Sequence, residues 1–170
     1  LKLIFNYISF DLSSTFHIPF ILKNKYDKVL VYQLSPITMA IPAIILKKIK
    51  KIPMDMYILD LWPESLLSTV NIGSKKIKDA MFKFCKKIYK QADGIYITSK
   101  GFKKKLVSYG IEEEKITYLP QWAEDIYKDA VIENDNELEQ LCKGKFNILF
   151  AGNVGKAQSI DTIINAANIC

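Results

Sequence analysis

The sequence predicts an α/β fold built on a Rossmann-like parallel sheet with flanking helices. Short apolar segments alternate with helical patterns from about residue 25 onward, which is typical of parallel α/β sheets. Of the 170 residues, 49% are apolar, enough for a core of ordinary size. With only 7 Gly and 6 Pro, collagen-like and low-complexity chains are excluded.

The first two predicted strands enclose one helix. The apolar run at 29–34 predicts a buried strand, followed by Ser35 as the N-cap and Pro36 as the first residue of a helix that ends near residue 48. Pro53 then precedes a second predicted strand at 54–59.

The next predicted helix begins after Ser74. In it Ile77, Met81, Phe84 and Ile88 recur every three or four residues, which predicts one buried apolar stripe. The lysines of this segment fall mostly away from that stripe, as on an exposed basic face.

Two further strands follow along the chain. The segment 94–98 predicts the third strand, and Ser99 then caps a helix that Gly110 closes. The segment 116–119 predicts a fourth strand, which Pro120 stops.

The C-terminal part predicts a linker and a second βα series. Acidic residues dominate 121–145, and no strand pattern occurs there, so we expect an interdomain linker with helical turns. A strand at 146–150 and a helix after 155 begin the second series, which divides the chain into parts at 1–120, 121–145 and 146–170. Because the chain starts at Leu1 rather than Met and stops at Cys170 within a helical pattern, we expect a fragment.

Charge is distributed unevenly along the chain. All 24 basic residues are lysines. Residues 1–110 hold 19 lysines against 7 acids, a net +12, whereas 111–170 hold 5 against 11, a net −6. The basic part fits an anionic partner such as a membrane, nucleic acid or a phosphate compound, and it equally fits solvated helix faces. The lysines at 47–51 and 103–105 are the candidate contacts with anionic lipid.

Cysteine, histidine and hydropathy exclude several classes of protein. Cys85, Cys142 and Cys170 are widely spaced, which predicts a reducing compartment with neither a disulfide framework nor a zinc site. His17 is the only histidine; a Ser-His-Asp triad built on it stays open, although no G-x-S-x-G motif supports one. The uncharged stretch 29–46 is long enough for a membrane span, but its central polar and proline residues favour a strand and a helix.

Ligands of parallel sheets bind where strands end, and this rule selects four loops, at 33–36, 60–64, 98–100 and 151–156. In the last loop, two glycines would allow close approach of a diphosphate, with a lysine beside it. The loop matches neither the Walker A nor the G-x-G-x-x-G pattern, and a plain structural turn is the alternative.

The loop after the second strand carries two carboxylates and an indole. Asp60 and Glu64 could act as acid or base or bind sugar hydroxyls, while Trp62 stacks on a sugar ring. The alternative is structural, with Asp60 capping the following turn and Trp62 filling the interface below it. Sequence alone leaves both possibilities open.

Four motifs together resemble one enzyme family. They are, in chain order, Tyr32-Gln33-Leu34-Ser35-Pro36, Asp60-Leu61-Trp62-Pro63-Glu64-Ser65, Leu119-Pro120-Gln121-Trp122-Ala123-Glu124-Asp125 and Gly152-Asn153-Val154-Gly155-Lys156-Ala157-Gln158. With these motifs the chain is similar to family-4 retaining glycosyltransferases of the GT-B fold, in particular to bacterial enzymes of capsule, O-antigen and colanic-acid-type polysaccharide biosynthesis. The resemblance covers nearly the whole chain, and its motifs occur in the order expected of that family.

The resemblance implies transfer of a hexose-type sugar from a nucleotide diphosphate sugar to a lipid-linked or saccharide acceptor, with retention of configuration. It implies no metal, and no cofactor apart from this donor substrate. The implied substrate-binding residues are Ser35, Asp60, Trp62, Glu64, Ser99 and Gln121, and the implied donor diphosphate-binding residues are Gly152, Asn153, Gly155, Lys156 and Gln158.

The resemblance also implies what the chain lacks. The catalytic residues stay unknown, because the family's glutamate pair would lie beyond Cys170 and its glycine-rich first loop before Leu1. We therefore expect no transferase activity from these residues alone. Asn153 and Leu59 stand where many members have arginine and histidine.

The implied location is the cytoplasm, peripheral to the inner face of the bacterial cell membrane. The implied partners are the nucleotide sugar, the lipid-linked acceptor and the anionic membrane surface, with no specific nucleic acid. One alternative is a non-catalytic Rossmann-like module that binds anionic lipid or nucleic acid. A nucleotide-sugar epimerase or other dinucleotide enzyme is the third hypothesis.

Overall fold

The computed structural model describes residues 2–128, 136–155 and 158–169. It divides into two compact units, Leu1–Gln121 (unit 1) and Trp122–Cys170 (unit 2). The division falls beside the start of the acidic segment predicted as a linker. The two units are described separately.

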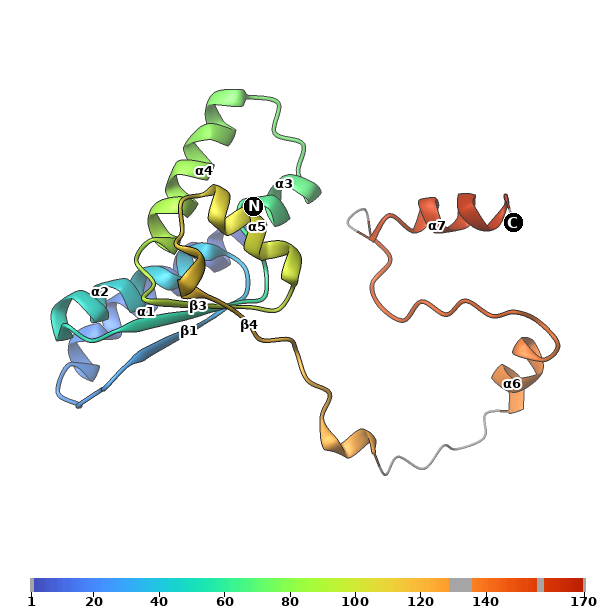
Figure 1. The fold of residues 1–170 in the computed structure, drawn as a ribbon, viewed down its shortest axis with the longest axis horizontal. Helices are drawn as coiled ribbons and strands as arrows, with labels where there is room; N and C mark the ends of the chain where they lie inside the picture. Colours follow the sequence, from blue (N-terminus) through green and yellow to red (C-terminus); the bar gives the residue numbers. More distant parts are fainter. Residues whose placement is uncertain (1, 129–135, 156–157, 170) are drawn as a thin grey trace. The chain divides into compact units, whose positions relative to one another are not determined.

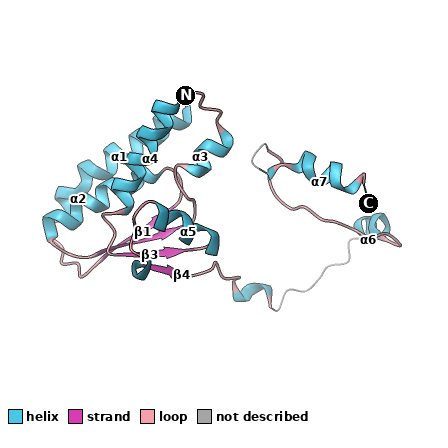
Figure 2. Cartoon of the chain, turned by 45° about the horizontal axis from the view of Figure 1, so that its top comes forward, coloured by secondary structure: helices cyan, strands magenta, loops and turns pink. Residues whose placement is uncertain are grey.

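Unit 1 is an α/β structure with a parallel sheet flanked by helices, as in Rossmann-like folds (Figure 1). Its four strands are adjacent in chain order: β1 (Val29–Gln33), β2 (Met54–Ile58), β3 (Gly94–Ile97) and β4 (Ile116–Tyr118). The four strand predictions for this unit are confirmed. Right-handed crossovers that all step in one direction put their helices on one face of the sheet, and Figure 2 shows the helices gathered on one side.

The helical layer consists of α2 (Ile41–Lys50), the short α3 (Glu64–Thr69), α4 (Lys75–Tyr89) and α5 (Lys100–Ser108). It covers a core of strand residues together with apolar residues of η1 (Ile37–Ala40), α4 and α5. Its most deeply buried members include Ile37, Met54, Met56, Ile58, Tyr89, Ile95, Ile97 and Leu106.

The predicted N-cap at Ser35 is wrong. The helix predicted from residue 36 is divided into the 3-10 turn η1 and α2, with Pro42 in the first turn of α2. Ser35 precedes both, and its hydroxyl donates a hydrogen bond to Asp60 at the end of β2. The Ser35 hydroxyl therefore binds the Asp60 carboxylate, which is close in space, and does not cap the helical segment that follows it in the sequence.

The apolar stripe predicted for α4 is partly wrong. Ile77 and Phe84 are 53% and 44% exposed, while Cys85, Ile88 and Tyr89 are buried. The helix therefore contacts the sheet mainly through its C-terminal half, on a face turned toward Cys85. Cys85 lies at the centre of that contact. A prediction based on the spacing of large apolar side chains overlooks a small residue of this kind.

The N-terminal helix α1 (Lys2–Ile21) was not predicted. Apolar residues surround most of this helix, so its sequence lacks the periodicity that indicates a helix. Ile18 is buried, and α1 contacts α2 and η1. None of the helices in the described part of the chain combines the length and the apolar character that crossing a bilayer requires.

Unit 2 contains η3 (Asp125–Tyr127), α6 (Asn136–Cys142) and α7 (Ile160–Ala167). The helix predicted after residue 155 is confirmed by α7, but the strand predicted at 146–150 is wrong. Phe146 and Leu149 are 94% and 90% exposed. A strand needs a neighbouring strand for its backbone hydrogen bonds, and the described residues of unit 2 include none.

Candidate functional site

The carboxyl ends of the four strands bring several sequence-predicted site residues to one edge of unit 1. Ser35 follows β1, Asp60 to Glu64 follow β2, Ser99 follows β3 and Gln121 follows β4. Because all four strands are parallel, these loops emerge at the same edge of the sheet.

Asp60 is the centre of a polar group at this edge, called here the carboxyl-edge cluster (Gln33, Ser35, Asp60, Trp62 and Ser65). Ser35 Oγ donates a hydrogen bond to Asp60 Oδ2, and Ser65 Oγ donates one to Asp60 Oδ1. Trp62 Nε1 donates to Ser35 Oγ at 2.9 Å, which fixes the indole beside the same hydroxyl. Asp60 is half-buried, and a carboxylate has about four acceptor positions, so it keeps capacity for a ligand hydroxyl.

Gln33 supports the cluster from below. Its side chain is fully buried, and Nε2 donates to the backbone oxygens of Leu34 and Asp60, the latter at 2.9 Å. Its Oε1 atom has no hydrogen-bond partner among the described residues. Buried amides normally satisfy both ends, so a free acceptor here is unusual. Gln33 thus holds the backbone of the Asp60 loop against the end of β1.

Glu64 belongs to a different network. Its Oε1 accepts a hydrogen bond from Tyr109 OH, and Lys105 Nζ lies 3.9 Å from the same oxygen. Asp60 and Glu64 share no hydrogen-bonding partner among the described residues. The arrangement thus does not pair the two carboxylates, although they belong to one loop.

Two buried groups, Tyr89 and Cys85, and the half-buried Tyr109 lie beneath this loop and remain protonated at neutral pH. Burial raises the pKa of Tyr89, whose hydroxyl accepts from the Trp62 backbone N–H at 2.9 Å and lies 3.2 Å from the Trp62 carbonyl oxygen. Burial and the hydrogen bond to Glu64 raise the pKa of Tyr109. Burial, and secondarily the charge of Glu64, raise the pKa of Cys85 to about 12. These groups therefore serve as neutral supports rather than as nucleophiles or bases.

The other two predicted residues of this edge lie apart from the cluster's hydrogen bonds. Ser99 caps α5, as predicted, since its Oγ accepts from the Gly101 N–H at 3.3 Å. Gln121 is exposed, and its Nε2 lies 3.5 Å from Tyr32 OH.

The predicted donor loop belongs to unit 2. Gly152, Asn153, Gly155 and Gln158 are described and are in an irregular segment before α7, whereas Lys156 lies outside the described residues. A Cβ at Gly155 would lie 3.0 Å from Gln158 Oε1, so the glutamine side chain folds over this glycine. A hollow at the start of α7 is lined by Val154, Gly155, Ser159, Ile160, Asp161 and Thr162. Diphosphate binding by this loop stays a prediction.

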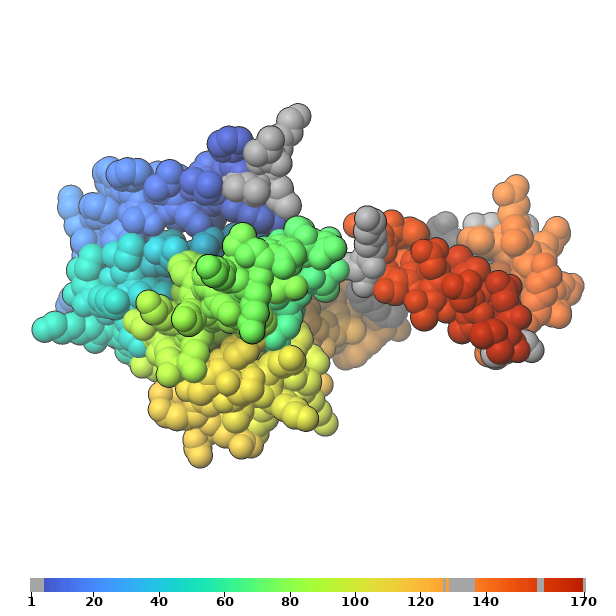
Figure 3. Space-filling model, turned by 90° about the horizontal axis from the view of Figure 1, so that it is seen from above, coloured from blue at the N-terminus to red at the C-terminus, as the bar shows by residue number. Residues whose placement is uncertain are grey.

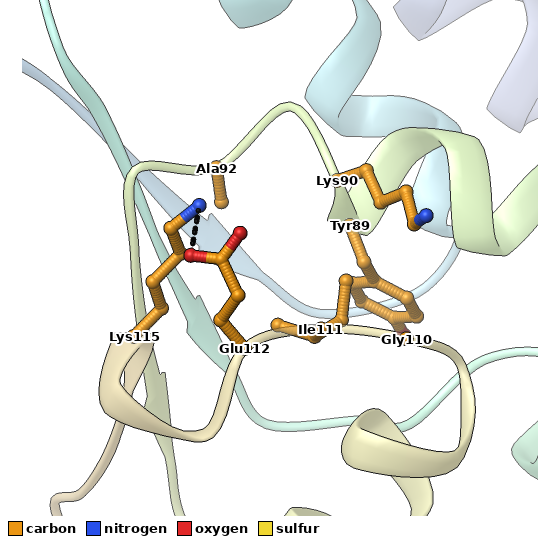
Figure 4. A pocket seen from close by; sticks show the side chains of 7 residues that line it. All are labelled: Tyr89, Lys90, Ala92, Gly110, Ile111, Glu112 and Lys115. Carbon is orange, nitrogen blue, oxygen red and sulfur yellow. Dashed lines mark ion pairs between the residues drawn. The ribbon is translucent and has the colours of Figure 1, made fainter.

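One cavity lies at the opposite, amino-terminal edge of the sheet. It measures about 150 Å³ and is lined in part by Ala92, just before β3, and Ile111, in the segment leading to β4. Figure 4 shows Lys115 paired with Glu112 beside it, at 3.0 Å. Since ligands of parallel sheets bind at the carboxyl edge, we do not assign the substrate site to this cavity.

Sequence reasoning missed the supporting roles of Gln33, Ser65 and Tyr109. A polar residue within the apolar run Val29-Leu30-Val31-Tyr32-Gln33 was a usable signal, because an amide in a buried strand needs partners. Nothing local pointed to Tyr109, which reaches Glu64 across 45 residues of chain.

No group of three or more His, Cys, Asp or Glu side chains suited to a metal ion occurs within residues 2–128, 136–155 and 158–169. Comparisons with models of protein families, with curated proteins and with solved structures find no match to this chain.

Proposed function

We propose that this chain is part of a retaining glycosyltransferase that moves a sugar from a nucleotide diphosphate sugar to a lipid-linked or saccharide acceptor in cell-surface polysaccharide biosynthesis. In this proposal unit 1 belongs to the acceptor-side domain of a GT-B enzyme, and residues 146–170 begin the donor-binding domain. What supports it is the convergence of Ser35, Asp60 and Trp62 at the carboxyl edge, residues that carry the family resemblance.

The chemistry of the carboxyl-edge cluster suits a saccharide acceptor. Asp60 accepts hydrogen bonds from two serine hydroxyls, a pattern that a sugar hydroxyl can extend or replace. The half-buried indole of Trp62 offers an apolar surface beside those polar atoms, and sugars present the same combination of apolar ring face and hydroxyl edge. Asp60, Ser35 and Trp62 are therefore assigned to acceptor binding, with no role in bond cleavage.

Saccharide binding by unit 1 tests this assignment directly. Saturation-transfer NMR on the 170-residue chain with a panel of hexoses and disaccharides is expected to detect binding. Asp60→Asn is expected to weaken it about tenfold or more, since hydrogen bonds to a charged group are strong. Ser68→Ala is the matched control, because Ser68 is exposed and bonds only locally, to the Ser65 carbonyl. Absence of binding, or equal binding by the Asp60→Asn variant, would contradict the assignment.

The transferase proposal as a whole is tested on the reading frame that encodes this chain. A downstream pair of glutamates seven residues apart and an upstream glycine-rich loop after a first strand are expected. The encoded enzyme should then transfer sugar with retention, which NMR of the product's anomeric proton measures. A complete reading frame without those two motifs would refute the proposal.

A non-catalytic module that binds anionic lipid or nucleic acid is the second candidate. The observation that favours it is a hollow at the amino-terminal edge of the sheet that Lys47, Lys48 and Lys51 line together with one acid, Asp93, which pairs with Lys47 at 2.6 Å. Sequence-selective binding of nucleic acid, measured by competition with unrelated sequences, would favour this candidate over the transferase.

A further inference from the structure

The cavity at the amino-terminal edge of the sheet, between the end of α4 and the segment 110–115, has an apolar floor. It is called here the lysine cavity, and its volume is about 150 Å³. Tyr89, Ala92 and Ile111 line it and are no more than 6% exposed. The Tyr89 hydroxyl is bonded to the Trp62 backbone, so it is not available to the cavity. A polar ligand here must therefore be bound by the groups at the rim.

Lysine side chains from two segments reach that rim. Lys90 and Lys115 line the cavity, and Figure 4 shows them on opposite sides of it. A Cβ at Gly110, another lining residue, would lie 3.5 Å from Lys86 Nζ and 3.8 Å from Lys90 Nζ. Two ammonium groups therefore meet beside one backbone position.

The glycine at that position makes the approach possible. Gly110 follows α5 with φ +77°, a conformation that glycine adopts without steric cost, and it has no side chain to fill the space before the lysines. Figure 3 shows α4 (green) beside the segment that begins with α5 (yellow). The close approach of Lys86 and Lys90 to Gly110 thus joins segments that are distant in the sequence.

The charges at the lysine cavity do not balance. Neither Lys86 nor Lys90 forms an ion pair with any residue that the structure describes. Glu112, the one acid among the described lining residues, is paired with Lys115 at 3.0 Å. Three lysines against one glutamate leave a net charge of +2. Like charges four residues apart at a helix end repel each other, so a counter-ion is favoured here.

The nearest other acid does not supply that counter-charge. Asp93 follows the lining residue Ala92, but its carboxylate is paired with Lys47 at 2.6 Å and also accepts a hydrogen bond from the Met54 N–H at 2.7 Å. It is thus engaged with α2 and β2. The positive charge of Lys86 and Lys90 has no partner within the described part of unit 1.

We propose that the lysine cavity binds a small, doubly charged oxyanion of the phosphate class. A dianion matches the net charge, and its several oxygens accept hydrogen bonds from more than one ammonium group at once. A monoanion such as chloride or acetate leaves a positive charge uncompensated. The volume is below the roughly 300–1,000 Å³ of sites for drug-sized ligands, which argues against a nucleotide. The inference does not depend on the proposed function.

Titration of the 170-residue chain with inorganic phosphate tests the proposal, with the backbone amide signals of Gly110 and Ile111 followed by NMR. At an ionic strength held constant with chloride, we expect saturable shifts of these two signals. Lys86→Gln/Lys90→Gln should weaken binding at least about tenfold, since hydrogen bonds between charged groups are lost.

Lys83→Gln/Lys87→Gln is the matched control. It makes the same change in charge at the same spacing on the same helix, at two exposed positions that do not line the cavity. Binding should stay within about twofold of the wild-type chain, because salt screens exposed charges that do not contact the ligand. Circular dichroism checks that each variant is folded. The single variant Lys90→Gln, at an exposed position, should show a smaller loss in the same direction.

Three outcomes would overturn the proposal. One is an equal loss of binding in both double variants, which indicates general attraction to a basic surface. Another is the absence of saturable shifts at millimolar phosphate. The third is tighter binding of glycerol phosphate than of inorganic phosphate, which would assign the cavity to a phosphomonoester instead of a free anion. The saccharide-binding assay is run without phosphate, so failure of either proposal leaves the other standing.

Discussion

Removal of the Ser35 hydroxyl tests the geometry of the carboxyl-edge cluster most directly. In Ser35→Ala, Asp60 loses one of its two serine donors, and Trp62 Nε1 loses its acceptor at 2.9 Å. A hydrogen bond to a charged group contributes about 1.5–3 kcal/mol, and an unpaired, partly buried donor costs about 1 kcal/mol. Unit 1 should therefore lose about 2–4 kcal/mol in its free energy of unfolding.

Ser65→Ala should cost less, about 1–2 kcal/mol, because it removes a donor from Asp60 without leaving another polar group unpaired. Ser68→Ala, at an exposed position, should stay within about 0.5 kcal/mol of the wild-type chain. Urea unfolding followed by Trp62 fluorescence measures all three, in a Trp122→Phe background that removes the second tryptophan. A Ser35→Ala variant no less stable than Ser68→Ala would refute the hydrogen-bonded geometry.

Three other predictions concern the core of unit 1. Gly94→Ala should destabilise unit 1 by about 1–3 kcal/mol, since the new Cβ would lie 2.9 Å from Asp55 Oδ1. Gly73→Ala is the control and should not destabilise it, because a Cβ there would have nothing within 4 Å. Equal stabilities of the two variants in urea would contradict this prediction. The Cys85 thiol should resist thiol reagents until denaturant is added, while exposed Cys142 reacts at once, and rapid modification of both would contradict its burial. Because burial raises the pKa of Cys85 from 9.0 to about 12, its thiol contributes stability that declines as pH rises above 9, which urea unfolding at increasing pH measures against Cys85→Ala.

The strands of unit 1 were predictable because their signals are local. Each is a short apolar run bounded by charged, glycine or proline residues, as at Pro53 before β2 and Pro120 after β4. The Ser99 cap was predictable for the same reason, since its acceptor and donor are two residues apart.

Predictions from hydrophobic periodicity failed for α1 and for the segment 146–150, where contacts with other elements decide the structure. The helix α1 is apolar on most sides, so its sequence contains no period to detect, and its stability comes in part from contact with α2 and η1. The segment 146–150 has the composition of a strand, but no neighbouring strand among the described residues provides hydrogen bonds for it.

The sequence by itself determined the α/β class, the order of the four strands along the chain and which loops follow them. Only the tertiary structure decided that the Ser35 hydroxyl binds Asp60 instead of capping the following helix. It also decided that Glu64 binds Tyr109 and shares no partner with Asp60, although both belong to one loop. The physical reason is distance along the chain. Ser35 and Asp60 are 25 residues apart and meet because β1 pairs in parallel with β2. Local patterns carry no information about such a contact, since it depends on the register of the sheet.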